Sequence, residues 1–380
     1  MRRGVTTPVS AAGWVEIDES AIAHNVRTIR AELGENVEFC AVVKADAYGH
    51  GIDIVAPVLA AQGVTIIGVA SNDDAAAVRR AGFTGRLMRV RPGGRDEIGD
   101  GIRFGVEEWI GGAAHAGIVG AVAAAQGVRM RVHLSLNSTG LGRDGIDLGE
   151  ATGMDAVTGV LADPNLDVVG LCSHFPCEDI TDVVEGASRF DAETRAVCVR
   201  AGAGDRIVRH CATTFAALRV PASRFDLVRI GAGLYGDTDA VGGVLRPAMR
   251  VASRIAAINP YRRGSTVGYE RWHRLDHDAR LAVIPLGYAD GIHRSLSGTG
   301  EVLVRGRRAP IVDRIAMNSF LVDVTRIDDA VAGDEAVLFG RQGDQTIASA
   351  DVEGAHGHIA ADLYVAWGRL LPRRRVVGDG

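Results

Sequence analysis

The segment EFCAVVKADAYGHG, residues 38–51, passes from a run of apolar and β-branched residues to a lysine and then to a glycine-containing turn. The run 38–43 is long enough for one buried strand, and Lys44 follows it directly. In a barrel of parallel strands, the side chains at the carboxyl ends of the strands face the mouth where ligands bind. The segment therefore predicts a strand that carries one amine to a binding site.

Similar apolar runs recur along the chain as far as residue 233, with helical patterns between them. The helical patterns include 21–33, 52–62, 73–81, 191–201 and 213–220. This alternation predicts an α/β fold of the (β/α)8 barrel type, and an open doubly wound sheet is the alternative. The eight predicted strands are 38–43, 64–70, 85–90, 103–106, 128–136, 166–175, 206–212 and 227–233.

The pattern of apolar runs and turns in the sequence changes near residue 240. Short β-branched runs such as 279–288 and 334–340 alternate with turns rich in Gly, Asp and Pro, which is typical of an antiparallel β domain. Short helical pieces are expected at 349–370. We therefore expect a barrel over 15–240 and a mostly antiparallel β domain over 241–380, with residues 1–14 packing against the β domain.

Composition excludes several classes of protein. The 380 residues include 42 basic and 47 acidic side chains, which give a formal net charge of -5. A protein that binds nucleic acid or a membrane surface needs a basic excess or patch, so neither partner is expected. Hydrophobic residues make up 47% and charged residues 23%, which indicates a folded globular protein.

Lysine is almost absent from the chain. Lys44 is the only lysine among the 42 basic residues, and the rest are arginine. Arginine can replace lysine wherever a surface charge is needed, but its guanidinium stays protonated and cannot attack a carbonyl. A single retained lysine suggests that this amine takes part in chemistry; the alternative is one chance survivor in a sequence with strong coding bias.

Cysteine and histidine usage indicates neither disulfides nor a metal site. The five cysteines form no CxxC pair, and His356 and His358 have no cysteine or acidic ligand at metal spacing. The opening MRRGVTTPVSAAG has no apolar stretch of the kind found in signal peptides. We therefore expect reduced thiols, no metal and a cytoplasmic location.

Several longer motifs, taken together, resemble the alanine racemase family. AVVKADAYGHG at 41–51 is similar to the family's pyridoxal-phosphate lysine motif, and the likeness continues in the family's order over nearly the whole chain. The other motifs are VHLSLNSTGLGRDG (132–145), CSHFPCED (172–179), HCATTFAALR (210–219), LVRIGAGLYG (227–236), TVGYERWHR (266–274), VIPLGYADGIHRSLSG (283–298), RAPIVDRIAMNSFLVDVT (308–325) and ADLYVAW (361–367).

The resemblance implies an isomerase, a racemase of amino acids that uses pyridoxal 5'-phosphate. It implies a cofactor-binding barrel, a β domain and a homodimer whose partner completes each active site. Lys44 then corresponds to the lysine that forms the Schiff base, and Tyr269 to the second catalytic base, supplied by the other subunit. Arg229 corresponds to the arginine that faces the pyridine nitrogen, where a permanent positive charge keeps the nitrogen unprotonated.

The resemblance also implies the remaining residues of the site. His174 corresponds to a residue that stacks on the cofactor ring, Arg143 and Met317 to residues that hold the substrate carboxylate, and Tyr288 to a residue of the access corridor. The phosphate contacts are expected from hydroxyls and backbone amides, which bind anions well at loop and helix starts. These expected contacts are Tyr48, Thr214, Gly231, Ala232 and Tyr364.

The sequence departs from plain alanine racemases near Arg143. That family carries a lysine in the preceding strand, often carbamylated, where this chain has Ser135 and no second lysine anywhere. We expect Asn137, with water or an anion, to hold Arg143 instead. Asn318 also stands where alanine racemases usually have Asp.

The residues of several motifs resemble those of the broad-specificity amino-acid racemases more than those of alanine racemase proper. HLSLNSTG (133–140), SHFPCED (173–179) and TVGYERW (266–272) carry this likeness. We therefore expect a broad-specificity or non-alanine racemase, and alanine racemase proper is the alternative. A decarboxylase or aldolase on the same barrel is less favoured because Arg229 opposes a protonated ring nitrogen. A cofactor carrier without activity is disfavoured by the presence of Tyr269 beside Lys44.

Overall fold

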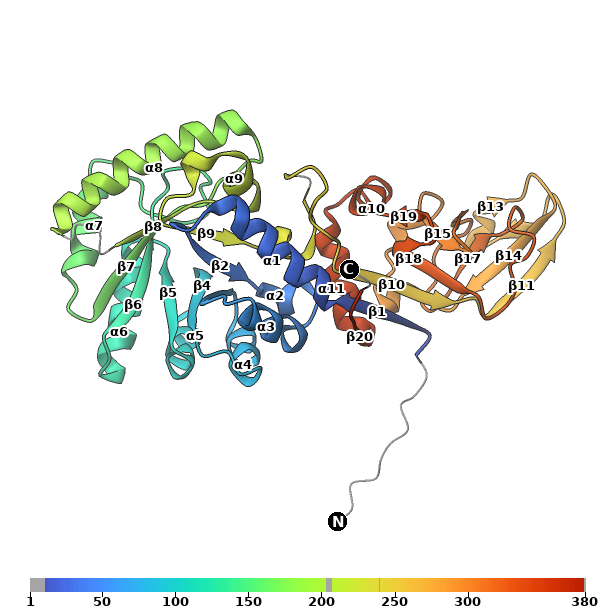
Figure 1. Cartoon of the computed structure of the whole chain (residues 1–380), viewed down its shortest axis with the longest axis horizontal. Coiled ribbons are helices and arrows are strands. Elements are labelled where there is room, and N and C mark those ends of the chain that lie inside the picture. The colour runs from blue at the N-terminus through green and yellow to red at the C-terminus, as the bar shows by residue number, and fades with distance from the viewer. Residues whose placement is uncertain (1–10, 203–206, 239, 379–380) are drawn as a thin grey trace, which may run out of the picture. The chain divides into compact units, whose positions relative to one another are not determined.

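The structure is a computed structural model that describes residues 11–202, 207–238 and 240–378 (Figure 1). Contacts within the chain define two compact units. The first, called here the barrel unit, holds Ser20–Ala47 and Ile52–Arg246.

The second unit, called here the C-terminal unit, holds the segment up to Glu19, the short segment Tyr48–Gly51, and Pro247–Gly380. Residues 1–10, which were expected to pack with the β domain, lie outside the described residues. The limits 15–240 and 241–380 remain predictions.

The barrel unit is built on a sheet of eight parallel strands, in the order β8-β7-β6-β5-β4-β3-β2-β9 (Figure 1). Helices connect these strands, so the predicted barrel fold is confirmed. The strands are β2 (Glu38–Val42), β3 (Ile66–Val69), β4 (Arg86–Pro92), β5 (Val106–Ile110), β6 (Met130–Ser135), β7 (Leu166–Cys172), β8 (Val208–His210) and β9 (Leu227–Ile230).

Local sequence signals explain most of the helices. Ser71 and Asp74 form a capping box that begins α4, and Gly127, with a φ of 64°, ends α6 in the left-handed region. Helices α5 and α7, and the first half of α8, were not predicted from the sequence. The longer helices are α1 (Glu19–Leu33), α3 (Ile52–Ala61), α4 (Asn72–Arg80), α5 (Arg95–Gly101), α6 (Ala113–Gln126), α7 (Gly153–Ala162), α8 (Ile180–Ala201) and α9 (Thr214–Arg219).

The position predicted for the fourth strand is wrong. Residues 103 and 104 lie in a 3-10 turn, η1 (Ile102–Phe104), and the strand β5 runs from Val106 to Ile110, so the prediction overlaps the strand only at Val106. The strand was missed because it carries Glu107 and Glu108, which interrupt the apolar pattern. Both carboxylates are buried and paired with arginines of β4: Arg86 contacts Glu107, and Arg89 contacts Glu108.

Alternation along β5 separates these two acids. Glu108 takes two hydrogen bonds from the fully buried Arg89, at 2.7 and 3.0 Å, and Arg89 also contacts Asn72 at the start of α4. Glu107 contacts side chains of β4 and β6 on the other face of the strand. Because successive side chains of a strand point to opposite faces, Glu107 lies inside the barrel and Glu108 lies under the helices.

Backbone hydrogen bonds connect the two ends of the sheet and close the barrel. The amide of Asp226 donates to the carbonyl of Arg209 at 3.1 Å, and the amide of Arg229 donates to the carbonyl of Ala212 at 3.0 Å. These bonds hold β9 next to β8. Arg229 is thereby fixed in the wall of the barrel with its side chain buried.

The C-terminal unit is mostly antiparallel, as predicted. In its largest sheet β1 (Gly13–Asp18) pairs antiparallel with β10 (Met249–Arg254) and parallel with β20 (Arg373–Val376). The sheet continues through β18, β15 and β16, and a separate three-stranded sheet holds β11, β14 and β17. These strands are β11 (Ala257–Tyr261), β14 (Ala279–Ile284), β15 (Glu301–Val304), β16 (Arg307–Pro310), β17 (Phe320–Asp323) and β18 (Glu335–Gln342).

Candidate active site

Lys44 stands where β2 ends, at the start of a turn with unusual backbone geometry. The segment α2 (Lys44–Tyr48) is wound in the left-handed sense, with φ near 55° at Ala45, Asp46 and Ala47. L-residues avoid this region, at a cost of roughly 1–2 kcal/mol each, and such strain is concentrated at functional sites. The turn sets the direction in which the Lys44 side chain leaves the strand.

Two carboxylates hold this turn in place. The Oδ1 atom of Asp46 accepts a hydrogen bond from the amide of Ile52 at 2.8 Å. The amide of Asp46 donates to Oδ1 of the buried Asp74 at 3.1 Å, and the other oxygen of Asp74 caps the start of α4. The strained turn is therefore attached to the N-terminus of a neighbouring helix.

The amine of Lys44 has an environment that favours its neutral form. Partial burial lowers its pKa, and the positive charges of Arg143 and Arg229 lower it further. Only a neutral amine can attack a carbonyl carbon or remove a proton, so a lowered pKa raises the reactive fraction at a given pH. The two arginines were both predicted as site residues, and both act on Lys44 electrostatically in the structure.

Arg229 is buried inside the barrel and held by several acceptors. Its Nη1 atom donates to Nδ1 of His210 at 2.6 Å, and its Nη2 atom donates to the carbonyl of Ser173 at 2.7 Å. The guanidinium carbon lies 5.4 Å from the centre of the Trp109 ring. Within the described residues, no carboxylate forms an ion pair with Arg229. Its charge is therefore left available for another group.

A buried chain of hydrogen bonds, which sequence reasoning missed, continues from Arg229. His210 Nε2 lies 2.9 Å from His133 Nδ1, and His133 Nε2 lies 2.9 Å from Glu107 Oε2. Both imidazoles are fully buried, and burial is the first cause that lowers their pKa values. The sequence offered one signal, which is a histidine at each of two predicted barrel strands.

Arg229 determines the donor and the acceptor in each hydrogen bond of the series that runs through His210 and His133 to Glu107. A guanidinium can only donate, so Nδ1 of His210 accepts and its proton sits on Nε2. That proton is donated to His133, whose own proton then sits on Nε2 and is donated to Glu107. Although burial alone would raise the pKa of Glu107, the hydrogen bonds from His133 and Arg86 lower it to about 2. Glu107 is therefore the ionised group at the end of this series of hydrogen bonds.

His174 follows β7 at the mouth of the barrel and is neutral. Burial lowers its pKa to about 3, with further contributions from Arg229, Arg143 and Lys44. Its Nδ1 atom lies 3.3 Å from Nη2 of Arg229 and accepts from it. A neutral imidazole in this position can stack on a flat conjugated ring without adding another positive charge.

Thr214, Gly231 and Ala232 lie together at the ends of β8 and β9. The hydroxyl oxygen of Thr214 accepts hydrogen bonds from the amides of Gly231 and Gly233, each at 3.3 Å. Helix α9 begins at Thr214, and a 3-10 turn, η4 (Ala232–Tyr235), begins beside it. Hydroxyls and backbone amides gathered at loop and helix starts bind anions well, so this corner of the mouth can accept an anionic group such as a phosphate.

Arg143 lies on the loop after β6 and pairs with its neighbour in sequence. Its Nε atom donates to Oδ2 of Asp144 at 3.1 Å. The structure describes both Asn137 and Arg143 and shows no direct hydrogen bond between them: the Asn137 side chain accepts from the amide of Gly142 at 3.0 Å and donates to Asp147 at 3.3 Å. The Asn137 side chain thus bonds within its own loop, and Asp144 is the residue that pairs with the charge of Arg143. The expectation that Asn137 holds Arg143 through water or an anion stays a prediction.

Tyr48 and Tyr364 both belong to the C-terminal unit. A Cβ atom at Gly49, whose φ is 80°, would lie 2.1 Å from the carbonyl oxygen of Tyr364, and a Cβ atom at Gly368 would lie 1.9 Å from that of Gly49. Glycine is therefore required where the segment after Tyr48 lies on α11 (Ala360–Leu370). The Tyr364 hydroxyl lies 2.7 Å from Oγ of Ser349 in α10 (Ser349–His356).

Tyr269, Tyr288 and Met317 are exposed on the C-terminal unit. Their exposed fractions are 67%, 43% and 55%. Tyr288 and Met317 are close together, because the amide of Ala289 donates to the carbonyl of Met317 at 3.0 Å. Tyr269 opens a short turn, η5 (Tyr269–Arg271), and the Glu270 side chain in that turn pairs with Arg314. All three side chains are therefore accessible on the surface of the C-terminal unit.

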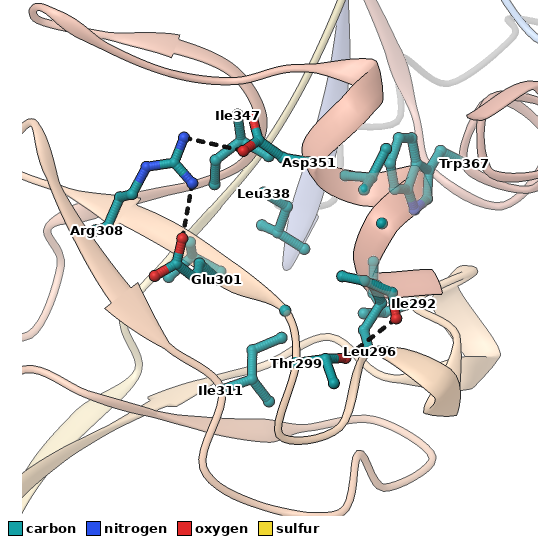
Figure 2. Close-up of a pocket in the computed structure, with 15 residues that line it drawn as sticks. Ile292, Leu296, Thr299, Glu301, Arg308, Ile311, Leu338, Ile347, Asp351 and Trp367 are labelled. Atoms are coloured by element: carbon teal, nitrogen blue, oxygen red, sulfur yellow. Dashed lines mark hydrogen bonds and ion pairs between the residues drawn. The ribbon is translucent and has the colours of Figure 1, made fainter. Parts of the chain in front are cut away.

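A separate cavity of about 270 Å³ lies in the C-terminal unit and contains no predicted site residue (Figure 2). Many of the residues that line it are apolar: Figure 2 shows Ile292 and Leu296 below Trp367, and Ile311 below Glu301. Arg308 stands at its edge and donates to Glu301 at 2.7 Å. The chemistry-bearing residues described above lie elsewhere in the chain.

Two further features are absent from the described parts of the chain. No helix there is long and apolar enough to cross a membrane. No cluster of three or more His, Cys, Asp or Glu side chains there has a geometry that could bind a metal ion.

The barrel mouth gathers a reactive amine, two arginines, a neutral imidazole and the hydroxyl and backbone groups around Thr214 that can accept an anion. Lys44, Arg143, His174, Thr214 and Arg229 come from different strands or the loops that follow them. Such a mouth can hold a flat anionic molecule with a carbonyl group over the amine. The exposed tyrosines of the C-terminal unit form the second group of predicted residues.

Comparisons with known proteins agree over both units. A family model described as "Alanine racemase, N-terminal domain" matches residues 17–239, and one described as "Alanine racemase, C-terminal domain" matches residues 248–375. A broad specificity amino-acid racemase from Pseudomonas putida is 41% identical over 368 residues, which cover 97% of this chain and 90% of that protein. A lysine racemase from Proteus mirabilis is 39% identical over 361 residues, which cover 95% and 88%. The crystal structure of alanine racemase from the D-cycloserine producing Streptomyces lavendulae superposes with a TM-score of 0.88 at 32% identity, covering 98% of each chain.

Proposed function

The chain belongs to the alanine racemase family and is an amino-acid racemase, and from this premise we propose that it interconverts L- and D-amino acids of several side-chain types with pyridoxal 5'-phosphate as cofactor. The observation that carries the proposal is the only lysine of the chain, Lys44, whose pKa is lowered at the barrel mouth by burial, Arg143 and Arg229. Broad specificity is supported by the P. putida relative, and a lysine racemase is also similar.

The residues of the barrel mouth fit this cofactor. When bound, pyridoxal phosphate supplies an aldehyde carbon that reacts with amines and a conjugated ring that takes up electrons from Cα. Lys44 would hold the aldehyde end covalently, and Thr214 with the amides of Gly231 and Ala232 would hold the phosphate. Tyr48 and Tyr364 would add hydroxyl contacts to the phosphate, and the neutral ring of His174 would lie against the cofactor ring.

Arg229 would decide which reaction the site favours. We place its guanidinium against the ring nitrogen, where its charge keeps that nitrogen unprotonated. Arg229 would thereby weaken the electron uptake that the bound cofactor supplies, which would favour return of a proton to Cα over side reactions. The absence of a carboxylate partner for Arg229 among the described residues keeps this charge undiminished.

Racemisation needs a proton removed from one face of Cα and another delivered to the opposite face. Lys44 would serve one face and Tyr269 the other. Because Tyr269 is exposed on the C-terminal unit, we propose that it enters the active site of a second copy in a homodimer. Tyr288 would line the access corridor of that shared site. Arg143 and the backbone of Met317 would hold the substrate carboxylate.

A screen of substrates tests this function. The purified holoprotein is incubated with each proteinogenic amino acid, and the appearance of the opposite enantiomer is followed by chiral chromatography. We expect racemisation of basic and unbranched aliphatic amino acids as well as alanine. Turnover of alanine alone would indicate alanine racemase proper, and release of carbon dioxide or an aldehyde would overturn the proposal.

A further inference from the structure

The carboxylate of Asp144 is bound by three side chains at once. Its Oδ1 atom accepts from Oγ of Ser135 at 2.7 Å and from Nε1 of Trp109 at 3.0 Å, and its Oδ2 atom accepts from Nε of Arg143 at 3.1 Å. Only 9% of the Asp144 side chain is exposed, whereas 50% of the Arg143 side chain is exposed. The acid is thus a fixed point, and the arginine extends from it towards solvent.

The backbone around Asp144 is also fixed. The amide of Gly145 donates to the carbonyl of Gly111, and the amide of Ile146 donates to the carbonyl of Ser135, both at 2.9 Å. Gly145 has a φ of 110°, and a Cβ atom there would lie 2.7 Å from the carbonyl carbon of Leu136. The loop therefore returns tightly onto the end of β6, and Asp144 cannot move away from Ser135.

The environment keeps Asp144 ionised. Burial alone would raise its pKa, but the hydrogen bonds from Ser135, Trp109 and Arg143 outweigh burial and lower the pKa. A buried carboxylate beside a half-exposed arginine restricts the arginine through a charge-assisted hydrogen bond, which is about twice as strong as a neutral one. Trp109 connects the same carboxylate to the centre of the barrel, because its ring also lies against the guanidinium of Arg229.

We propose that Asp144 is a positioning residue that holds Arg143 ready for the substrate carboxylate. The chain thereby supplies from its own sequence the negative charge that Arg143 needs, without a modified side chain or a bound anion. Ser135 and Trp109 act on Arg143 only through Asp144. The inference rests on the proposed function, since it assigns Arg143 to substrate binding.

Two variants of Asp144 test this role in the holoprotein. Asp144→Asn keeps the size of the side chain and removes the charge, so we expect KM for the amino acid to rise about tenfold while kcat falls less. Asp144→Ala leaves a space, and added formate should restore a large part of the lost kcat/KM. The wild type should respond to neither formate nor chloride.

Matched controls separate positioning from a structural effect. Asp147→Asn alters a carboxylate of the same loop that contacts Asn137 and not Arg143, and it should leave KM unchanged. Arg143→Gln should raise KM, and the double variant with Asp144→Asn should be no worse than Arg143→Gln alone, because the two residues act as a unit. Ser135→Ala removes one hydrogen bond to Asp144 and should show a smaller rise in KM. It tests the same role if an Asp144 variant does not fold.

The outcomes distinguish the two proposals. An active wild type together with an unchanged KM in Asp144→Asn would overturn the positioning role alone. Additive losses in the double variant, or failure of formate to act on Asp144→Ala, would do the same. A wild-type protein that binds cofactor and racemises no amino acid would overturn the proposed function and this inference with it.

Discussion

Nη1 of Arg229 donates a hydrogen bond to Nδ1 of His210 at 2.6 Å, and this one contact fixes the proton positions of two buried imidazoles. Because the guanidinium cannot accept, the protons of His210 and His133 both lie on Nε2 and point towards Glu107. The arginine at the site and the carboxylate on β5 are therefore connected through the interior of the barrel.

Removing the charge of Glu107 should destabilise the barrel in a pH-dependent way. The pKa of Glu107 falls from its ordinary value of 4.5 to about 2, so its stabilisation is present above pH 4.5 and is lost as the pH falls towards 2. We expect Glu107→Gln to lower the free energy of unfolding by about 3 kcal/mol at neutral pH. Urea denaturation at neutral pH and at about pH 3 measures the difference, which should shrink in acid. A difference that stayed constant with pH would contradict the assignment.

Lys44 should be the only residue that binds the cofactor covalently. Lys44→Ala should lose the visible absorbance of the bound cofactor and all racemase activity. Lys44→Arg is the matched control, because it keeps the positive charge and removes the reactive amine, and it should fail in the same way. Borohydride reduction followed by peptide mapping of the wild type should place the label on Lys44. A label on any other residue would refute the assignment.

Tyr269→Phe should remove the base on one face of Cα and leave the base on the other face. The variant should keep the cofactor absorbance, because Tyr269 is not expected to hold the cofactor, and it should lose racemisation by about a hundredfold or more. In deuterated water, one enantiomer should still exchange its Cα proton without forming the other, because Lys44 still serves its own face. Proton NMR measures the exchange for each enantiomer. Equal exchange of both enantiomers would argue against two separate bases.

The left-handed turn after Lys44 should respond to glycine in an unusual way. Ala45 has a φ of 56°, so Ala45→Gly should relieve strain and leave stability unchanged or raise it by up to about 1 kcal/mol. Ala77→Gly, in the ordinary right-handed helix α4, should lower stability by about 1 kcal/mol. Thermal unfolding compares the two. A loss at position 45 as large as that at position 77 would show that the turn carries no strain.

The barrel could be predicted from the sequence because most of its strands are continuous apolar runs. Strand β5 was displaced because Glu107 and Glu108 break that pattern. Their arginine partners, Arg86 and Arg89, lie about twenty residues earlier on β4. Only the pairing of the two strands brings the charges together, and single-sequence periodicity contains no information on which strands pair.

The candidate site residues came from the sequence by a different route. Lys44, Arg229 and Tyr269 were named from motifs that resemble the alanine racemase family, and their roles remain predictions. Asp144 was missed although it is next to Arg143, because its role depends on Ser135 and Trp109 of two barrel strands. Asn137 was expected to hold Arg143 with water or an anion, and in the structure its side-chain oxygen accepts a hydrogen bond from Gly142 of its own loop.

The buried histidines have a consequence for the dependence of rate on pH. His174, His133 and His210 all have lowered pKa values, and the pKa of Glu107 is lowered as well. His174 and Glu107, with pKa values of about 3 and about 2, keep one charge state as the medium changes from mildly acidic to mildly alkaline, and burial favours the neutral forms of His133 and His210. A plot of log kcat/KM against pH should then show inflections only from the two groups that exchange protons with Cα and from the substrate's own amine.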